Sequence, residues 1–227
     1  MITTIIFDLD DTLYSEIDYC KSGFTAVSEY LGRLPDTPDA KVIYDVLWKE
    51  FTSGNRRTTF NAALDDLGIT YDDKFIHELI NVHRNHRPNI TLPAESREIL
   101  REFNDKYTLA LITDGFLPAQ QLKVEALAIE KYFKVIIYTE QLGREFWKPS
   151  PVGFEKIMAN TDAKAENICY IADNEKKDFL APNNLGFVTI QLLRPDRLHT
   201  KTRPEPNAKA SYTIKTLSQL PKLIENL

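Results

Sequence analysis

Residues 2–14 of the chain have the sequence ITTIIFDLDDTLY. The first part, residues 2–9, is almost continuously apolar and rich in β-branched residues, which predicts a strand covered on both faces. Comparable runs follow at residues 107–113, 133–138, 167–172 and 187–192, with a short strand at 212–214. Helical patterns, with apolar residues three and four positions apart, occur at residues 94–104, 118–130, 151–160, 176–184 and 217–226. This alternation predicts an α/β fold, a Rossmann-like doubly wound parallel sheet.

One long segment breaks the alternation. Between residues 14 and 88 there are only helical patterns, at residues 19–31, 40–52, 58–67 and 72–87, separated by prolines and glycines. Pro88 and Pro93 mark the return to the sheet, because each disfavours helix in the residue before it. We therefore predict a core domain of residues 1–14 and 90–227 and a small helical domain of residues 15–89 inserted into it.

The composition excludes several classes of protein. A chain of 227 residues with 43% hydrophobic residues is long enough to bury a core. The net charge of −5 gives nucleic acid and anionic membranes no electrostatic reason to bind. No apolar run approaches the roughly 20 residues that span a bilayer. Cys20 and Cys169 lie far apart and indicate neither a disulfide framework nor a zinc site. We expect a cytoplasmic protein with a small-molecule partner, while its oligomeric state stays open.

Three carboxylates, those of Asp8, Asp10 and Asp11, lie within four residues at the end of the first predicted strand. Carboxylates crowded at the end of a buried strand raise one another's pKa, and burial makes their ionised forms costly. A bound Mg²⁺ ion resolves this conflict, since it takes oxygen ligands and needs few carboxylates. The alternative is structural, because Asp11 or Thr12 can cap the turn that follows.

A second acidic pair follows the strand predicted at residues 167–172. Because the carboxyl ends of parallel strands meet at one edge of a sheet, Asp173 can converge with Asp8 and Asp10 on one metal. Asp178, expected in the first turn of the next helix, can support that site. Capping is again the alternative, with Asp173 or Asn174 starting the helix.

Two more strand ends supply groups that suit a phosphate. Thr113, Asp114 and Gly115 close the strand predicted at residues 107–113, where a hydroxyl and the start of a helix favour an anion. Lys148 precedes a helix that Pro151 initiates, and its ammonium group can neutralise phosphate oxygens at the same edge. Each signal is weak alone, since a threonine at a strand end often caps and a loop lysine is usually solvated.

Together, the order and spacing of these groups resemble the four motifs of the haloacid dehalogenase-like hydrolase superfamily. The motifs are Asp8-x-Asp10-x-Thr12, Thr113, Lys148 followed by Pro149, and Asp173 with Asp178. The resemblance covers nearly the whole chain. It includes the helical insertion after the first motif, which resembles the C1 type of cap in this superfamily.

The resemblance implies a role for each matching residue. Asp8 would be the nucleophile that forms an aspartyl-phosphate, and Asp10 the acid and base. Thr113, Asp114 and Lys148 would bind the substrate, with Thr113 and Lys148 also taking part in catalysis. Metal binding is implied for Asp8, Asp10 (through its backbone carbonyl), Asp173 and Asp178, with Mg²⁺ as the cofactor. The substrate would be a small phosphate ester, a nucleoside monophosphate or a sugar phosphate.

Two positions refine this expectation. The family usually has glycine where this chain has Ala172, and alanine would be strained only if the backbone there had a positive φ angle. We expect ordinary extended backbone and an intact site. Asp10 favours phosphate chemistry, because dehalogenases and phosphonoacetaldehyde hydrolases of the superfamily lack this aspartate. A phosphomutase, or a binding module that keeps the fold without catalysis, remains the alternative.

The inserted domain should select the substrate by closing over the sheet edge. Candidate contacts are Tyr14, Asp18, Tyr19, Arg56 and Arg57. The arginines can pair with a second anionic group and the tyrosines can stack on a ring. The plainer interpretation, that the arginines are solvated and the tyrosines pack between the inserted domain and the core, is favoured for any single residue.

Aromatic and histidine residues of the insertion are not assigned to a site. His83 and His86 are expected on an exposed polar helix face, because charged and amide residues surround them. His77 is likewise given no role. Trp48 and Phe51 are expected in the core of the inserted domain.

Overall fold

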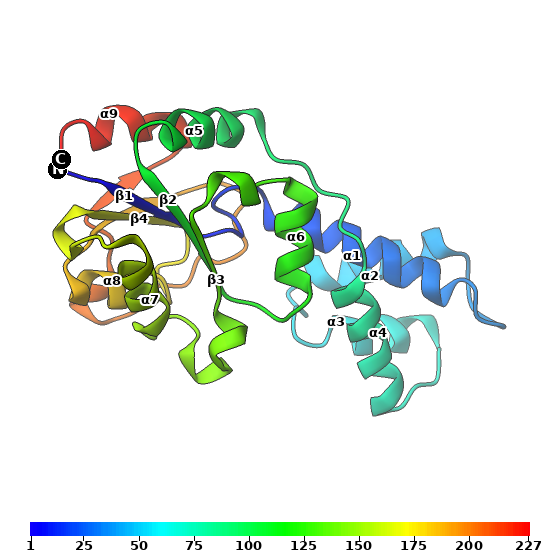
Figure 1. Cartoon of the computed structure of the whole chain (residues 1–227). Helices are drawn as coiled ribbons and strands as arrows, with labels where there is room; N and C mark the ends of the chain where they lie inside the picture. The colour runs from blue at the N-terminus through cyan, green and yellow to red at the C-terminus, as the bar shows by residue number, and fades with distance from the viewer. The chain divides into compact units, whose positions relative to one another are not determined.

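Six strands form one sheet in the computed structural model, which describes residues 1–227 (Figure 1). They are β1 (Thr4–Phe7), β2 (Thr108–Thr113), β3 (Val135–Tyr138), β4 (Ile168–Ala172), β5 (Val188–Leu192) and β6 (Tyr212–Ile214). The spatial order is β3-β2-β1-β4-β5-β6, and every neighbouring pair is parallel. The predicted α/β class with a parallel sheet is confirmed.

The position of β1 determines where the site forms. Phe7 pairs with Leu111 of β2 on one side and with Ile171 of β4 on the other. The chain therefore leaves β1 in the middle of the sheet, beside the ends of β2 and β4. All four residues of β1 are buried, as expected for a strand that is covered on both faces.

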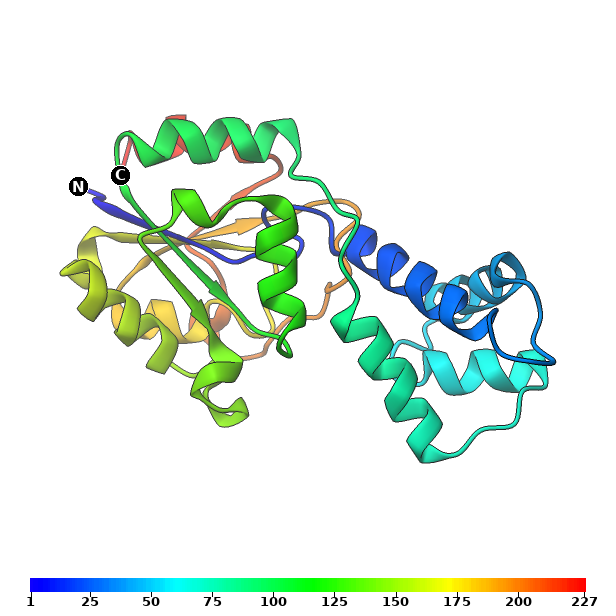
Figure 2. The same ribbon diagram turned by 45° about the vertical axis from the view of Figure 1, so that its right-hand side comes forward.

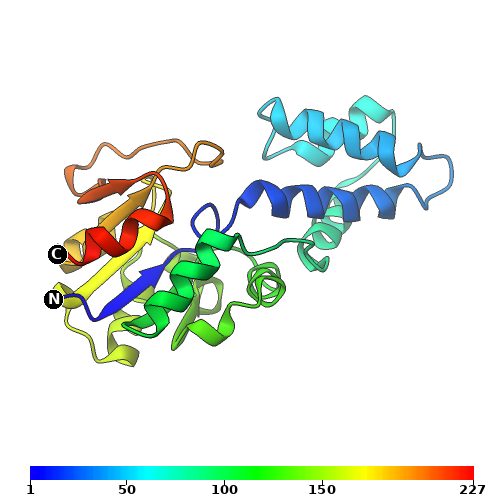
Figure 3. The same ribbon diagram turned by 90° about the horizontal axis from the view of Figure 1, so that it is seen from above.

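Helices cover both faces of this sheet. In Figures 1 and 3, α5 (Ala94–Asn104) and α9 (Leu220–Ile224) lie on one face, and Figure 1 places α7 (Val152–Thr161) and α8 (Leu180–Leu185) on the other. Helix α6 (Ala119–Leu127) connects β2 to β3. Apolar residues between α7, α8 and the strands form a buried cluster that includes Ile6, Ala110, Ile112, Phe154, Ile157, Tyr170 and Phe179.

Short 3₁₀ helices complete the connections. They are η1 (Glu130–Tyr132), η2 (Thr139–Leu142), η3 (Arg144–Phe146), η4 (Ala165–Asn167), η5 (Pro206–Ala208) and η6 (Leu217–Gln219). No helix of the chain is both long enough and apolar enough for a membrane span.

The chain divides into two compact units, one of Met1–Ile17 with Thr91–Leu227 and one of Asp18–Ile90. The second unit, visible in Figure 2, contains most of α1 (Glu16–Leu31) and all of α2 (Ala40–Thr52), α3 (Thr59–Leu67) and α4 (Asp73–Asn85). Asp39 and Asp72 cap α2 and α4 with their carboxylates, and Gly68 ends α3 with a φ angle of +65°. Its buried residues include Ile43, Leu47, Phe51, Ala63, Leu64 and Leu79.

The exposed histidine face predicted for α4 is wrong. The His83 ring packs against Tyr19, Phe24 and Phe60, with ring centroids 5.4, 5.7 and 6.0 Å away. It also covers Gly23, where an added Cβ would lie 2.3 Å from the ring. The histidine fills a space that the missing glycine side chain leaves, which the charged sequence around His83 did not indicate.

Two predicted helices also differ from the structure. Helix α8 begins at Leu180 rather than at residue 176, because Asn174 and Asp178 hold a turn there. The Asn174 side chain accepts from the backbone of Lys176, and Asp178 Oδ2 accepts from the backbone of Asn174. The C-terminal helix is divided into η6 and α9, with Pro221 in the first turn of α9.

Candidate active site

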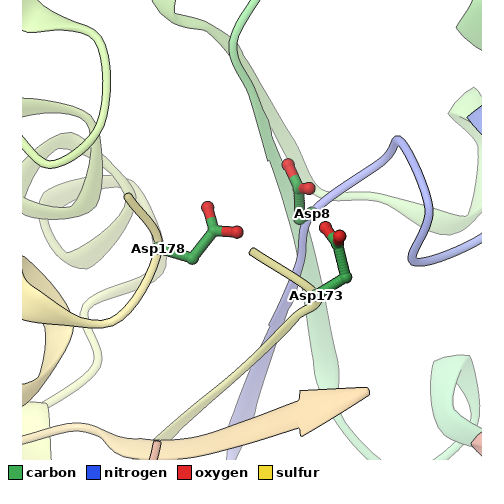
Figure 4. A group of neighbouring side chains, drawn as sticks. All are labelled: Asp8, Asp173 and Asp178. Atoms are coloured by element: carbon green, nitrogen blue, oxygen red, sulfur yellow. The ribbon is translucent and has the colours of Figure 1, made fainter. Parts of the chain in front are cut away.

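Three buried carboxylates converge where β1 and β4 end (Figure 4). Asp8 directly follows β1, and Asp173 directly follows β4, so the parallel pairing of these strands brings the two together. Asp178 reaches the same place from the turn that precedes α8. One oxygen of each residue lies within 4.8 Å of the others, and all three residues are at most 2% exposed.

The electrostatics of this cluster suit a cation. Burial, with the added repulsion of Asp178 and Asp8, raises the pKa of Asp173 to about 9. Burial also raises the pKa of Asp8 to about 6, although Lys148 opposes this effect. Asp173 Oδ2 is buried without a hydrogen-bond partner. A buried set of oxygen donors with one unsatisfied oxygen fits Mg²⁺.

Lys148 lies between two of these carboxylates. Its Nζ is 2.7 Å from Asp8 Oδ1 and 2.7 Å from Asp178 Oδ1, and its side chain is fully buried. Burial alone would lower the pKa of Lys148, but Asp178 and Asp8 raise it well above its usual value. Nζ also donates to the Tyr170 hydroxyl (3.1 Å), which in turn donates to Asp178 (3.1 Å). Tyr170 was not predicted, because a tyrosine within an apolar strand is typical of a core.

Asp10 is bound by side chains that the motif pattern does not contain. Lys123 Nζ lies 2.8 Å from Asp10 Oδ1 and 3.0 Å from Oδ2, and Gln120 Nε2 donates to Oδ2 at 2.9 Å. The Tyr14 hydroxyl donates to Oδ1. Burial would raise the pKa of Asp10, but Lys123 and the hydrogen bonds from Lys123, Tyr14 and Gln120 lower it. The available signal was a pair of polar residues one turn apart at core-facing positions of α6.

Thr113 and Asp114 occupy different environments. Thr113 is fully buried, and its Oγ1 accepts a hydrogen bond from Gln120. Asp114 accepts from the Thr139 hydroxyl (2.8 Å), the Lys148 backbone N–H (3.2 Å) and Lys177 Nζ (3.2 Å). Burial would raise the pKa of Asp114, but Lys177 and Lys148 lower it. The Asp114 carboxylate thus holds the segments that carry the two lysines.

For Asp11, the capping interpretation agrees with the structure. Its Oδ1 accepts from the backbone of Glu16 (2.8 Å) at the start of α1, and Oδ2 accepts from the backbone of Leu198 (2.6 Å). Asp11 has a φ angle of +55°, which aspartate tolerates better than most residues. The hydroxyl of Thr12 is buried without a partner, so it provides no cap.

A cavity of about 420 Å³ opens beside these groups, within the range of small-molecule sites. Its walls combine acidic residues of the cluster with several cations. The lining residues are Asp8, Asp10, Glu16, Asp114, Trp147, Lys148, Pro149, Asp173, Asn174, Lys176, Lys177, His199 and Arg203. Thr113 and Asp178 are not among the residues that line it. An anionic ligand here would meet Lys148 and Lys177 at the carboxyl edge of the sheet.

Ala172 leaves the site undisturbed. It is the last residue of β4 and is paired in register with Gln191 of β5. Its backbone is therefore extended, as expected, and alanine causes no strain there. Gln191 also donates to the backbone carbonyl of Asp173 (2.9 Å), which fixes the turn that carries this carboxylate.

The residues expected to select the substrate make contacts within their own units. Tyr14 is bound to Asp10, as described above. Tyr19 is buried and donates to the His83 carbonyl, while Asp18 pairs with Lys21 at the surface. Arg56 lies over the Phe51 ring, 5.5 Å from its centroid, and Arg57 is exposed. Tyr19 is thus packed within the helical unit, and the selectivity role stays a prediction.

The fold and these groups define an α/β protein with a lysine-bridged acidic centre at the carboxyl edge of a parallel sheet. Residues 5–192 match the family model described as haloacid dehalogenase-like hydrolase, and the chain belongs to that family. The family predicted from the four motifs is therefore confirmed, and the chain is a hydrolase.

Curated relatives of the chain are phosphatases. The chain is 28% identical over its whole length to 99% of the glyceraldehyde 3-phosphate phosphatase of Methanocaldococcus jannaschii. Over 99% of the chain it is 25% identical to the complete ribulose-1,5-bisphosphate 5-phosphatase of Halopiger xanaduensis. Its fold is similar to that of the magnesium-bound HAD hydrolase YfnB of Bacillus subtilis, with a TM-score of 0.71, 21% identity and 98% of each chain covered.

Proposed function

We propose that this chain is a Mg²⁺-dependent phosphatase that hydrolyses a small phosphate ester through an aspartyl-phosphate on Asp8. The observation that carries the proposal is the buried Asp8 carboxylate at the end of the central strand, in an ion pair with Lys148. The activities named for the two curated relatives support a sugar phosphate, and a nucleoside monophosphate remains the other substrate class.

The chemistry proceeds in two displacements at phosphorus. In the first, an oxygen of Asp8 bonds to phosphorus as the ester oxygen leaves, and Asp10 gives that oxygen a proton. In the second, Asp10 takes a proton from water as the water oxygen attacks phosphorus, and the bond to Asp8 breaks. A phosphate next to Asp10 adds negative charge, which favours the protonated carboxyl needed in the first step.

Lys148 stabilises both steps. Its ammonium group already lies 2.7 Å from the Asp8 carboxylate, and it faces a cavity that can hold a phosphate. Charge that develops on the phosphoryl oxygens therefore meets a fixed, buried cation. In this proposal the Thr113 hydroxyl, whose Oγ1 accepts a hydrogen bond from Gln120, donates to the phosphate.

The acidic cluster provides the metal site of this proposal. Asp8, Asp173 and Asp178 would hold Mg²⁺, together with the backbone carbonyl of Asp10. When bound, Mg²⁺ neutralises the crowded carboxylates and the charge of the phosphate. The fit rests on the three convergent carboxylates and the unpartnered oxygen of Asp173.

We also propose that the helical unit Asp18–Ile90 is the cap. The chain enters this unit directly after the loop that carries Asp8, Asp10 and Tyr14, and it returns at Thr91. A cytoplasmic location is proposed as well, in agreement with the free thiols of Cys20 and Cys169.

Hydrolysis of p-nitrophenyl phosphate tests the activity. We expect phosphate release that requires Mg²⁺, stops with EDTA and falls by at least about 10³-fold in Asp8→Asn, which removes the nucleophile. Asp105→Asn, at an exposed residue of the core, is the matched control and should keep full activity. Phosphate release that persists in EDTA or in Asp8→Asn contradicts the proposal. An isomeric phosphate ester, formed from a sugar phosphate in place of free phosphate, would instead identify a mutase.

A further inference from the structure

Helix α6 contributes two side chains to the Asp10 carboxylate. Lys123 Nζ contacts both carboxylate oxygens, at 2.8 and 3.0 Å, and Gln120 Nε2 contacts Oδ2 at 2.9 Å. Gln120 and Lys123 are three residues apart on the helix, so they project from the same face. Together, the ammonium group near both oxygens and the amide near one of them restrict the rotation of the carboxylate.

These two residues are buried in a way that their chemistry does not favour. Gln120 is 2% exposed and Lys123 is 3% exposed, whereas lysine and glutamine are mostly found at protein surfaces. Burying an ammonium group is costly unless a carboxylate compensates for it. A simpler sequence would place apolar residues at both positions of α6. The burial of this polar pair is therefore explained by its contacts with the site and not by the packing of α6.

Gln120 also links two predicted site residues. Its Nε2 donates to Asp10 Oδ2 and to Thr113 Oγ1. Because Thr113 Oγ1 accepts this bond, the proton of its own hydroxyl remains available for donation. The turn that leads from Thr113 into α6 seats the amide closely: a Cβ added at Gly115 would lie 2.8 Å from the Gln120 side chain.

We propose that Gln120 and Lys123 are positioning residues, which hold the Asp10 carboxylate and the Thr113 hydroxyl in the orientation that phosphoryl transfer requires. This inference rests on the proposed phosphatase function, and it concerns residues outside the four motifs. Neither residue lines the cavity, so both act through Asp10 and Thr113.

Kinetics of three variants test the inference. We expect Lys123→Met and Gln120→Leu to lower kcat by about 10- to 100-fold, the range expected for a misplaced group, with KM within about twofold of wild type. Lys123→Arg keeps the charge and should recover part of kcat. Lys106→Met, which removes an exposed ion pair of the core, is the matched control and should leave both constants unchanged. Unchanged or increased kcat in both Lys123→Met and Gln120→Leu overturns the inference.

A double-mutant cycle separates positioning from general support of the fold. If Lys123 acts through Asp10, Lys123→Met should cause no further loss of kcat in an Asp10→Asn background. A merely structural lysine would give losses that multiply, and that result overturns the inference. The same cycle with Gln120→Leu leaves Lys123 in place, which provides a measurement even if Lys123→Met fails to fold.

Acid-quenched phosphoenzyme gives an independent readout. Nitrophenolate leaves readily without a proton, so the first step proceeds in all variants, while the second step needs Asp10 to accept a proton from water. We expect Asp10→Asn and Lys123→Met to accumulate phosphoenzyme relative to wild type and to Lys106→Met. If Lys123→Met contains only as much phosphoenzyme as wild type, this inference is contradicted while the proposed function is not. An inactive wild-type protein would overturn the proposed function and, with it, this inference.

Discussion

Among the three carboxylates of the site, Asp173 is the one whose negative charge has no direct ion pair with Lys148. Two other carboxylates lie within 4.8 Å, and its Oδ2 has no hydrogen-bond partner. Lys148 contacts Asp8 and Asp178, so its direct ion pairs compensate these two carboxylates. The folded protein without metal therefore contains a carboxyl group whose ionised form is disfavoured by burial and by like charge.

Replacement of this carboxyl should reveal the cost. We expect Asp173→Asn to raise the free energy of unfolding in EDTA at pH 7 by about 1 kcal/mol, since an amide is neutral without the proton that the Asp173 carboxyl must take up on folding. The same variant should lack the thermal stabilisation by Mg²⁺ that we expect for the wild-type protein. Asp162→Asn, at an exposed residue with φ +53°, is the control. An unchanged Mg²⁺ effect in Asp173→Asn would remove Asp173 from the metal site.

Some residues of the site could be predicted from their position at a strand end, whereas others were recognised only in the structure. Asp8, Asp173 and Lys148 follow strands or precede a helix, so their convergence follows from parallel topology. Lys123 and Tyr170 belong to a helix and a strand whose apolar pattern predicts only the element. Whether the polar group of such a residue contacts the site depends on packing between elements that are far apart in the sequence.

At the scale of elements, the strands were predicted within about two residues and most helices within a turn. The spacing of apolar residues is enough to locate these strands and helices, because each of them buries one face or both. The prediction was wrong at residues 176–179, where the Asn174 and Asp178 side chains bond to the backbone and prevent helix. Such local competition has no periodic signature.

Packing of α7 on β2 provides a prediction for an element. A Cβ added at Gly153 would lie 2.6 Å from Ile112 Cδ1, inside the buried cluster. Alanine favours helix by about 1 kcal/mol over glycine, but overpacking costs about 1–3 kcal/mol. We therefore expect Gly153→Ala to lower the free energy of unfolding in urea titrations.

The neighbouring side chain provides the control. Ile112→Val removes the methyl group that the new Cβ would meet. In that background, Gly153→Ala should cost nothing or should stabilise the protein through helix propensity. A loss that is equal in both backgrounds would show that the contact with Ile112 is not its cause.

The whole molecule consists of two units that differ in how they occupy the sequence. One is a single continuous stretch, Asp18–Ile90, and the other is assembled from both sides of it. A hydrogen bond joins the two sequence segments of the core unit: the Ser96 hydroxyl donates to the Leu13 carbonyl at 2.6 Å. The insertion was predicted from the loss of strand patterns, whereas its boundaries depend on contacts that a pattern does not contain.

Removal of the helical unit tests the independence of the core. A chain with residues 18–90 replaced by a short glycine and serine linker should unfold cooperatively and show the same stabilisation by Mg²⁺ that we expect for the full chain. The reason is that Asp8, Lys148, Asp173 and Asp178 all belong to the core. Circular dichroism melting with Mg²⁺ and with EDTA measures both properties. Loss of the Mg²⁺ effect in a folded core would show that the helical unit completes the metal site.

The central position of β1 has a consequence for the order in which the sheet and the site can assemble during synthesis. Thr4 pairs with Ile168, and Phe7 pairs with Ile171, across more than half of the sequence. During synthesis the helical unit is finished as one stretch, while the strand made first waits for its second neighbour until β4 has been made. Asp8 is thus among the first residues translated, yet it cannot be enclosed with Asp173 and Asp178 before most of the chain has left the ribosome.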